Sequence, residues 1–134
     1  METTILVVDD SKMQVHLLER ILRDLGYTNV ETAHCCDEAI KLLSAKKVDL
    51  ILSDWHMPGA SGLDLLKRVR SQKSTESVPF VMITSEHEKS SIFEAAKAGL
   101  QGYVLKPVNK DALKKKLYSL AKNHPSLNPP HEAM

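Results

Sequence analysis

The stretch LILSDWHMPGASG, residues 50–62, decides the fold class of this chain. An apolar run from Leu50 to Leu52 leads through Ser53 to the carboxylate of Asp54, and a Met-Pro pair and two glycines follow. A strand that is apolar almost throughout is typical of a parallel sheet that helices cover on both faces. The stretch therefore predicts a buried parallel strand that brings Asp54 to the edge of the sheet where ligands bind, with a sharp turn after it.

Outside this stretch, short apolar runs alternate with longer segments whose apolar residues recur at helical spacing. Strands are expected at residues 5–8, 29–33, 48–53, 80–84 and 102–106. Helices are expected around residues 15–25, 39–47, 63–69, 92–99 and 113–121. This order predicts an α/β fold, in which right-handed crossovers place helices on both faces of a parallel sheet.

The first helix carries its own start and stop signals. Ser11 is suited to cap its first turn, with Gln14 three residues on as the capping-box partner. Gly26 suits the position after its last turn, where the backbone adopts a left-handed conformation.

Composition limits the classes of function. The 134 residues fit one domain, 43% of them are apolar, and the net charge is +1, so no global field selects a partner. The adjacent Cys35 and Cys36 are poorly placed for a disulfide or a zinc site. No apolar stretch approaches the roughly 18 residues of a membrane span, and the first residues lack the basic segment of a signal peptide. We expect a cytoplasmic protein that does not bind a membrane.

Polar residues stand where several of the expected strands end. These are Asp9 and Asp10, Asp54, Thr84 and Lys106. If the first and third strands are neighbours, three carboxylates converge, and their mutual repulsion raises at least one pKa. A hard cation removes this conflict, and Mg²⁺ prefers oxygen ligands. The group suits transfer of a phosphoryl group to Asp54, in which a protein mainly positions and neutralises charge.

Four motifs in order resemble the receiver domain of bacterial two-component response regulators, of the single-domain chemotaxis type. The motifs are VVDDS (7–11), LSDWHMPGASG (52–62), ITS (83–85) and GYVLKP (102–107). The resemblance covers residues 4–122 and implies a flavodoxin-like, doubly wound (βα)5 sandwich with strand order 2-1-3-4-5. It divides the chain into a receiver domain, residues 1–122, and a flexible or loosely docked tail, residues 123–134.

The resemblance also implies roles for the acidic residues. Asp54 would accept the phosphoryl group from a sensor histidine kinase. Asp10 and Asp54 would bind Mg²⁺ together with the backbone carbonyl of His56, and Asp9 would act mainly through metal-bound water.

Further roles follow from the same resemblance. Thr84 and Lys106 would hold the phosphoryl group, and Thr84 and Tyr103 would form a switch pair, with the Tyr103 ring turning inward on phosphorylation. The bond between Lys106 and Pro107 would be cis. A target protein would bind the surface formed by the fourth helix, the fifth strand and the fifth helix.

The expected function is a phosphorylation-dependent switch that promotes its own phosphorylation and dephosphorylation and is not a conventional enzyme. A carrier in a phosphorelay is the alternative. A metal-dependent phosphatase is disfavoured because His56 stands two residues after Asp54, where such an enzyme needs a carboxylate. A constitutive module with an inactive site is disfavoured because all five site residues are present.

Several residues also have simpler interpretations. Asp9 and Asp10 could cap a helix, and Trp55 is expected to be half exposed beside the site. The lysine run at 114–116 is expected to be a solvated face and no nucleic-acid site, because no aromatic stacking platform accompanies it. The basic fifth helix and the tail could form a docking strip for a partner.

Overall fold

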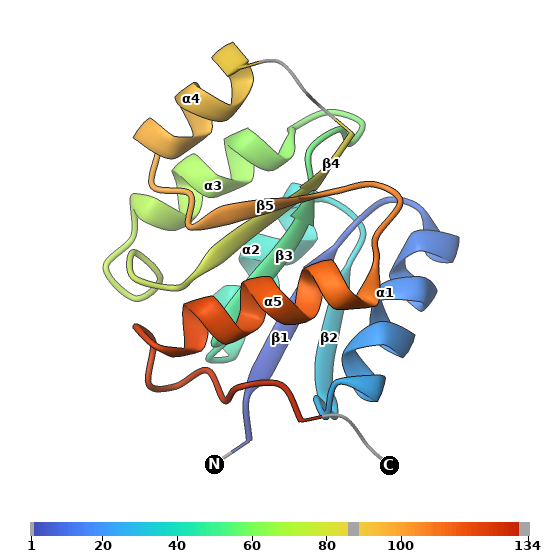
Figure 1. Cartoon of the computed structure of the whole chain (residues 1–134). Helices are drawn as coiled ribbons and strands as arrows, with labels where there is room; N and C mark the ends of the chain where they lie inside the picture. The colour runs from blue at the N-terminus through green and yellow to red at the C-terminus, as the bar shows by residue number, and fades with distance from the viewer. Residues whose placement is uncertain (1, 86–88, 132–134) are drawn as a thin grey trace.

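The computed structural model describes residues 2–85 and 89–131, and the chain forms a sheet between two layers of helices (Figure 1). The strands are β1 (Thr4–Val8), β2 (Asn29–Ala33), β3 (Leu50–Asp54), β4 (Phe80–Thr84) and β5 (Gly102–Leu105). The helices are α1 (Lys12–Asp24), α2 (Cys36–Ala45), α3 (Gly62–Arg70), α4 (Lys89–Lys97) and α5 (Lys110–Ala121). The alternating α/β pattern predicted from the sequence is confirmed. The third strand begins two residues later than expected, and the fifth ends one residue earlier.

All strand pairs are parallel, in the order β2-β1-β3-β4-β5. This is the predicted flavodoxin-like order, in which the crossover direction reverses between β1 and β3. Val8 lies opposite Ser53, so the chain leaves β1 and β3 at the same level of the sheet. The residues that follow these two strands therefore meet at the carboxyl edge.

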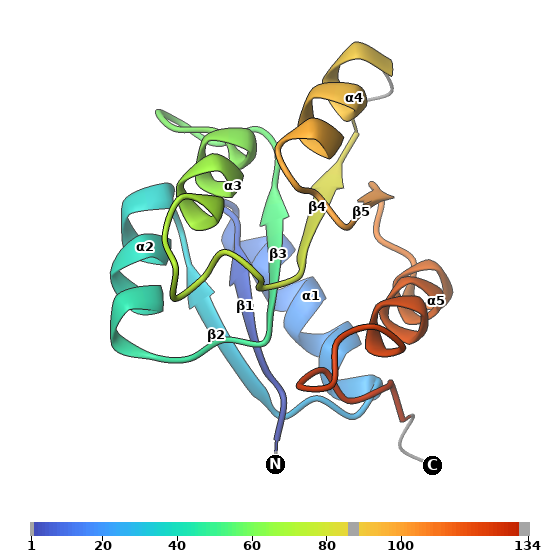
Figure 2. The ribbon, with the colours of Figure 1, turned by 90° about the vertical axis from the view of Figure 1, so that its left-hand side faces the viewer.

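The sheet is buried on both faces, as the apolar sequence of β3 predicts. Leu50 and Leu52 join a core with α1 and α5, whereas Ile51 joins a second core with α2 and α3. Figure 2 shows α2 and α3 on one side of the sheet and α1 and α5 on the other. Within the described residues, no helix combines the length and the apolar character that a membrane crossing needs.

The helix ends follow local chemistry. The Ser11 hydroxyl caps α1 by accepting from the Gln14 backbone N–H, but the Ser11 N–H donates to Asp9 Oδ1, so the predicted capping box with Gln14 is wrong in its second half. Gly26 has φ +96°, which confirms the predicted left-handed stop. The turn before α2 uses Cys35 in an extended conformation as the residue that precedes the helix.

The tail lies against the body of the domain as far as the structure describes it. Leu127 is 2% exposed and belongs to the core that α1 and α5 form with the sheet. In both ribbon views the tail, in dark red, passes the end of the sheet where the N-terminus lies (Figures 1 and 2). The domain boundary at residue 122 stays a prediction, and so does the flexibility of the tail. Of the two alternatives expected for the tail, flexible or loosely docked, the burial of Leu127 favours the docked one.

Candidate functional site

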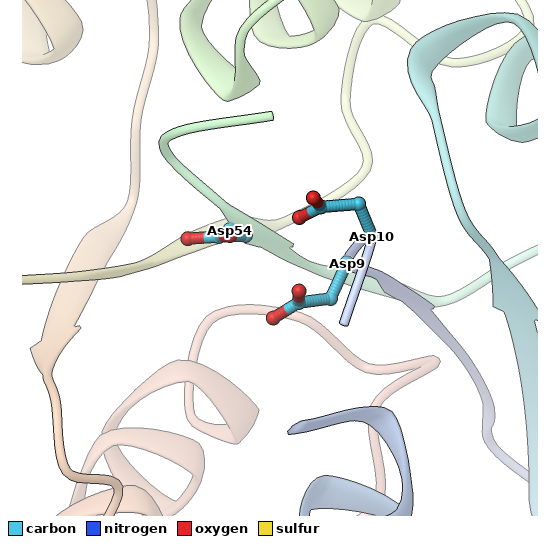
Figure 3. Close-up of side chains that lie close together, drawn as sticks. All are labelled: Asp9, Asp10 and Asp54. Carbon is cyan, nitrogen blue, oxygen red and sulfur yellow. The ribbon is translucent and has the colours of Figure 1, made fainter. Parts of the chain in front are cut away.

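Three carboxylates meet at the carboxyl edge of the sheet, where β1 and β3 end. Asp9, Asp10 and Asp54 each offer one oxygen, and these oxygens lie within 4.8 Å of one another. Figure 3 shows Asp9 and Asp10 projecting from the end of β1 toward Asp54 at the end of β3. The neighbouring positions of these strands bring together residues that are 44 positions or more apart in the sequence.

A turn after β1 allows two consecutive aspartates to reach the same point. The Asp9 backbone N–H still donates to the Ala33 carbonyl, as a strand residue does. Its Oδ1 then accepts from the Ser11 N–H at 2.9 Å, which closes a turn around Asp10. Asp10 therefore leaves the strand direction and faces the same side as Asp9, instead of the opposite face of the sheet.

Asp9 is held in an unfavourable environment for a negative charge. It is 1% exposed, and its Oδ2 is buried without a hydrogen-bond partner among the described residues. Burial raises the pKa of the Asp9 carboxyl, and the charges of Asp54 and Asp10 raise this pKa further, against the lowering effects of Ser11 and Lys106. A cation between these carboxylates would remove the repulsion and supply the missing partner of Oδ2.

A lysine approaches the cluster from the neighbouring part of the sheet. Lys106 Nζ lies 2.8 Å from Asp54 Oδ1, and the Asp54 side chain is 6% exposed. The Lys106 backbone N–H donates to the Thr84 carbonyl at 2.9 Å, so the residue directly follows the last pairing of β4 with β5. Thr84 is 1% exposed. The predicted cis bond between Lys106 and Pro107 is present.

The turn after β3 packs directly beneath Asp54. The Gly62 N–H donates to the Trp55 carbonyl at 2.8 Å. A Cβ atom added at Gly62 would meet the Asp54 carbonyl oxygen and would lie 2.7 Å from Met82 Sδ. Because both neighbours are part of the packed core and backbone, only glycine lets α3 begin this close to the strand end.

The structure brings five of the predicted site residues to one edge of the sheet: Asp9, Asp10, Asp54, Thr84 and Lys106. His56 has an exposed side chain, and its backbone carbonyl as a metal ligand stays a prediction. Tyr103 is 39% exposed and pairs in register with Met82, two residues before Thr84. Its role as the partner of Thr84 in a switch also stays a prediction.

Two features of the turn differ from the sequence expectation or were missed by it. Trp55 is 7% exposed and packs in the core on the α2–α3 side with Met57, so the expectation of a half-exposed ring is wrong. Ser61 and Asp64 form a reciprocal capping box at the start of α3, with bonds of 2.8 and 3.2 Å. The spacing of a serine and an acidic residue three positions later is the signal that could have identified this box.

The donor set fits Mg²⁺. An octahedral magnesium ion binds oxygens at about 2.1 Å, which places its ligands roughly 3 to 4 Å apart. The three carboxylate oxygens lie within a comparable range, and all of them are hard ligands. The buried Oδ2 of Asp9 is the atom whose environment most requires a cation.

The chain is similar to known proteins over most of its length. Residues 5–118 match the family described as the response regulator receiver domain. The chain is 40% identical over 113 residues to the chemotaxis protein CheY of Pseudomonas aeruginosa, covering 84% of this chain and 91% of that protein. It is equally identical to chemotaxis protein CheY-3 of Vibrio cholerae, with 84% and 87% covered.

Solved structures share the overall fold. Chemotaxis protein CheY4 of Vibrio cholerae superposes with a TM-score of 0.82 at 33% identity, covering 87% of this chain and 97% of that one. The signal receiver domain of an HD domain-containing protein from Pseudomonas fluorescens gives a TM-score of 0.85 at 27% identity, covering 94% and 99%. Together with the acidic edge of the sheet, these matches show that the chain belongs to the response regulator receiver domain family, as a CheY-like signalling domain of a two-component system.

Proposed function

We propose that this protein is a switch controlled by phosphorylation of Asp54, with a histidine kinase as phosphodonor and Mg²⁺ as cofactor. The observation that carries the proposal is the ion pair between Lys106 Nζ and Asp54 Oδ1 at 2.8 Å, beside the oxygens of Asp9 and Asp10. The Asp54 carboxylate thus faces the Lys106 ammonium group on one side, and the carboxylates of Asp9 and Asp10, which could bind a cation, on the other. This is an arrangement that phosphoryl transfer requires.

Asp54 acts as the nucleophile in this proposal. One of its carboxylate oxygens forms a bond to phosphorus while the phosphorus–nitrogen bond of the kinase phosphohistidine breaks, and the imidazole leaves with that electron pair. Lys106 moves with the charge from the carboxylate to the phosphoryl oxygens. Asp10 and Asp54, with the backbone carbonyl of His56, would hold Mg²⁺, which would supply positive charge beside the transferring group.

The charges of the cluster explain why both cations are needed. Three carboxylates contribute three negative charges, and Lys106 contributes one positive charge. A divalent cation makes the group neutral before transfer, and a dianionic phosphoryl group on Asp54 leaves one net negative charge. Without the metal and the lysine the phosphorylated group would hold four negative charges in a partly buried place, at a high electrostatic cost.

The output surface in this proposal is formed by α4, β5 and α5, which follow one another along the edge of the sheet in both ribbon views (Figures 1 and 2). Four large apolar side chains on these elements are exposed, namely Phe93 (61%), Tyr118 (46%), Tyr103 (39%) and Leu105 (39%). Exposed aromatic residues favour protein binding. The added phosphoryl charge would draw the Thr84 hydroxyl, and the Tyr103 ring would then turn inward and change this surface.

The chemotaxis proteins among its relatives support a chemotaxis-type target protein, and we place this activity in the cytoplasm. In this role the protein catalyses only reactions of its own Asp54. It takes up the phosphoryl group and later loses it to water, and it does not turn over a separate substrate.

Labelled acetyl phosphate with Mg²⁺ tests the proposal. The wild-type protein and the control variant Asp24→Asn, whose carboxylate is exposed at the far end of α1, should take up label equally. Asp54→Asn should take up none, and Lys106→Ala should take it up more slowly. The proposal is wrong if Asp54→Asn takes up as much label as the wild type.

A further inference from the structure

The C-terminal tail is packed over the amino edge of the sheet, opposite the carboxylate cluster. Leu127 is 2% exposed and belongs to the core of α1 and α5, and Pro130 is also buried. In Figure 2 the arrows of β1 and β3 point up, and the tail lies below α5, beside the starting ends of β1 and β2. The tail thus adds Leu127 to the core that α1 and α5 form with the sheet.

One end of the tail is bonded to the start of β1. The Thr3 hydroxyl donates to the Ser126 carbonyl at 3.2 Å and accepts from the Asn128 N–H at 2.8 Å. Thr3 is 4% exposed, so its hydroxyl forms hydrogen bonds with the tail and not with water. A single side chain therefore holds two backbone groups on either side of the buried Leu127.

A second set of bonds joins the tail to the turn between α1 and β2. The Tyr27 hydroxyl donates to the Asn128 carbonyl at 2.6 Å, and the His131 N–H donates to the Leu25 carbonyl at 2.7 Å. Burial raises the pKa of the Tyr27 hydroxyl, which keeps it a donor. A Cβ atom at Gly26 would meet the His131 carbonyl oxygen, so the tail passes directly over this glycine.

We propose that residues 124–131 form an intramolecular strap that ties the end of α5 to the start of β1 and to the α1–β2 turn. The strap closes the core at the amino edge and fixes the C-terminal end of α5. Leu127 and Pro130 are buried, and the backbone groups of Ser126, Asn128 and His131 are bonded inside the molecule, so the strap serves the domain itself and does not act as a docking segment for a partner.

The sequence of the strap suits this role. It contains Pro125, Pro129 and Pro130, which restrict the unfolded chain and so reduce the entropy lost on docking. The strap touches none of the three carboxylates or Lys106, since it lies at the other edge of the sheet. Its removal should therefore lower stability and leave the chemistry of the site in place.

A comparison of Thr3→Val in two backgrounds separates the strap from other effects of the substitution. In the full chain, Thr3→Val leaves the Ser126 carbonyl and the Asn128 N–H without their partner and should lower Tm by about 3 °C or more. In a chain that ends at Asn123 the same substitution should have no such effect, because the strap is absent. An equal fall in Tm in both backgrounds would overturn the proposal.

Hydrogen exchange on the intact protein gives a test that does not depend on a truncated chain folding. The amides of Asn128 and His131 should exchange at least about tenfold more slowly than in an unstructured peptide. Leu127→Ala should remove this protection and lower Tm, whereas Ser126→Ala should change neither, since only the Ser126 carbonyl is used. Unprotected amides at Asn128 and His131 in the wild type would show that no strap exists.

Uptake of label from acetyl phosphate, a measurement that rests on the proposed function, tests whether the strap acts only at the amino edge. Leu127→Ala should take up label at the wild-type rate at a temperature well below its Tm. A rate changed severalfold in the folded Leu127→Ala variant would contradict a strap that is confined to the amino edge.

Discussion

Replacing Asp9 by asparagine should stabilise the metal-free protein and weaken its response to Mg²⁺. Asp9 is 1% exposed, and its Oδ2 lacks a hydrogen-bond partner among the described residues. Its pKa is raised above 3.8, chiefly by burial. The folded protein therefore binds the Asp9 proton more tightly than the unfolded chain does. In the metal-free protein this carboxyl lowers stability as the pH rises from about 3.8 through its raised pKa, and the loss is complete above that raised pKa.

The size of the effect follows from the environment of Asp9. A buried polar group without a partner costs about 1–3 kcal/mol. An asparagine keeps the acceptor for the Ser11 N–H and turns its amide toward the carboxylates of Asp10 and Asp54. We therefore expect the free energy of unfolding in the presence of a chelator to rise by about 1–2 kcal/mol at pH 7, or about 3–8 °C in Tm.

Thermal unfolding with chelator and then with millimolar Mg²⁺ measures both effects. The wild type should gain stability from the metal, by about 2.7 kcal/mol where its concentration is a hundred times the Kd. Asp9→Asn should gain much less, and the exposed control Asp24→Asn should respond as the wild type does. A less stable metal-free Asp9→Asn with an undiminished Mg²⁺ response would refute the reasoning.

Three further substitutions test the surroundings of Asp54. Lys106→Ala should slow labelling by acetyl phosphate at least about tenfold while keeping a Mg²⁺-dependent rise in Tm, and an unchanged rate would remove Lys106 from the mechanism. Ser61→Ala should lower the free energy of unfolding by about 1 kcal/mol through loss of the cap, as chemical denaturation can measure; no loss would mean that the capping box contributes nothing. Gly62→Ala should destabilise more than Gly59→Ala, because an added Cβ meets the Asp54 carbonyl oxygen and Met82 Sδ at position 62, whereas at position 59 it meets open space and only the positive φ of +78° opposes alanine; a smaller loss in Tm for Gly62→Ala would contradict this packing.

The fold could be predicted because its signals are local and agree with one another. In β3, residues that face either side of the sheet are apolar, which indicates a strand covered on both faces. Gly26 marks the end of α1. Once the order of strands and helices is known, the chirality of crossovers leaves few topologies. The convergence of Asp9 and Asp54 follows from that topology, because parallel strands end at one edge, whereas Asp10 joins them through the turn that Asp9 and Ser11 close.

The remaining features depend on packing that no short segment of sequence encodes. The burial of Trp55 results from contacts with the α2–α3 layer, which the residues around it do not reveal. The docking of Leu127 requires a space between α1 and α5 and a hydroxyl at Thr3, more than 120 positions away. A proline-rich segment of low apolar content resembles a disordered one by composition, and only the tertiary contacts distinguish the two.

The most direct measurement of the central claim locates the phosphoryl group on the chain. Borohydride reduces an acyl phosphate to an alcohol, so treatment of the protein after acetyl phosphate and Mg²⁺ marks the phosphorylated carboxyl. We expect mass spectrometry of the tryptic peptide that spans residues 48–67 to find the mark at Asp54, and to find none when Mg²⁺ is chelated. A mark at Asp9 or Asp10 instead, or equal marking without the metal, would contradict the account.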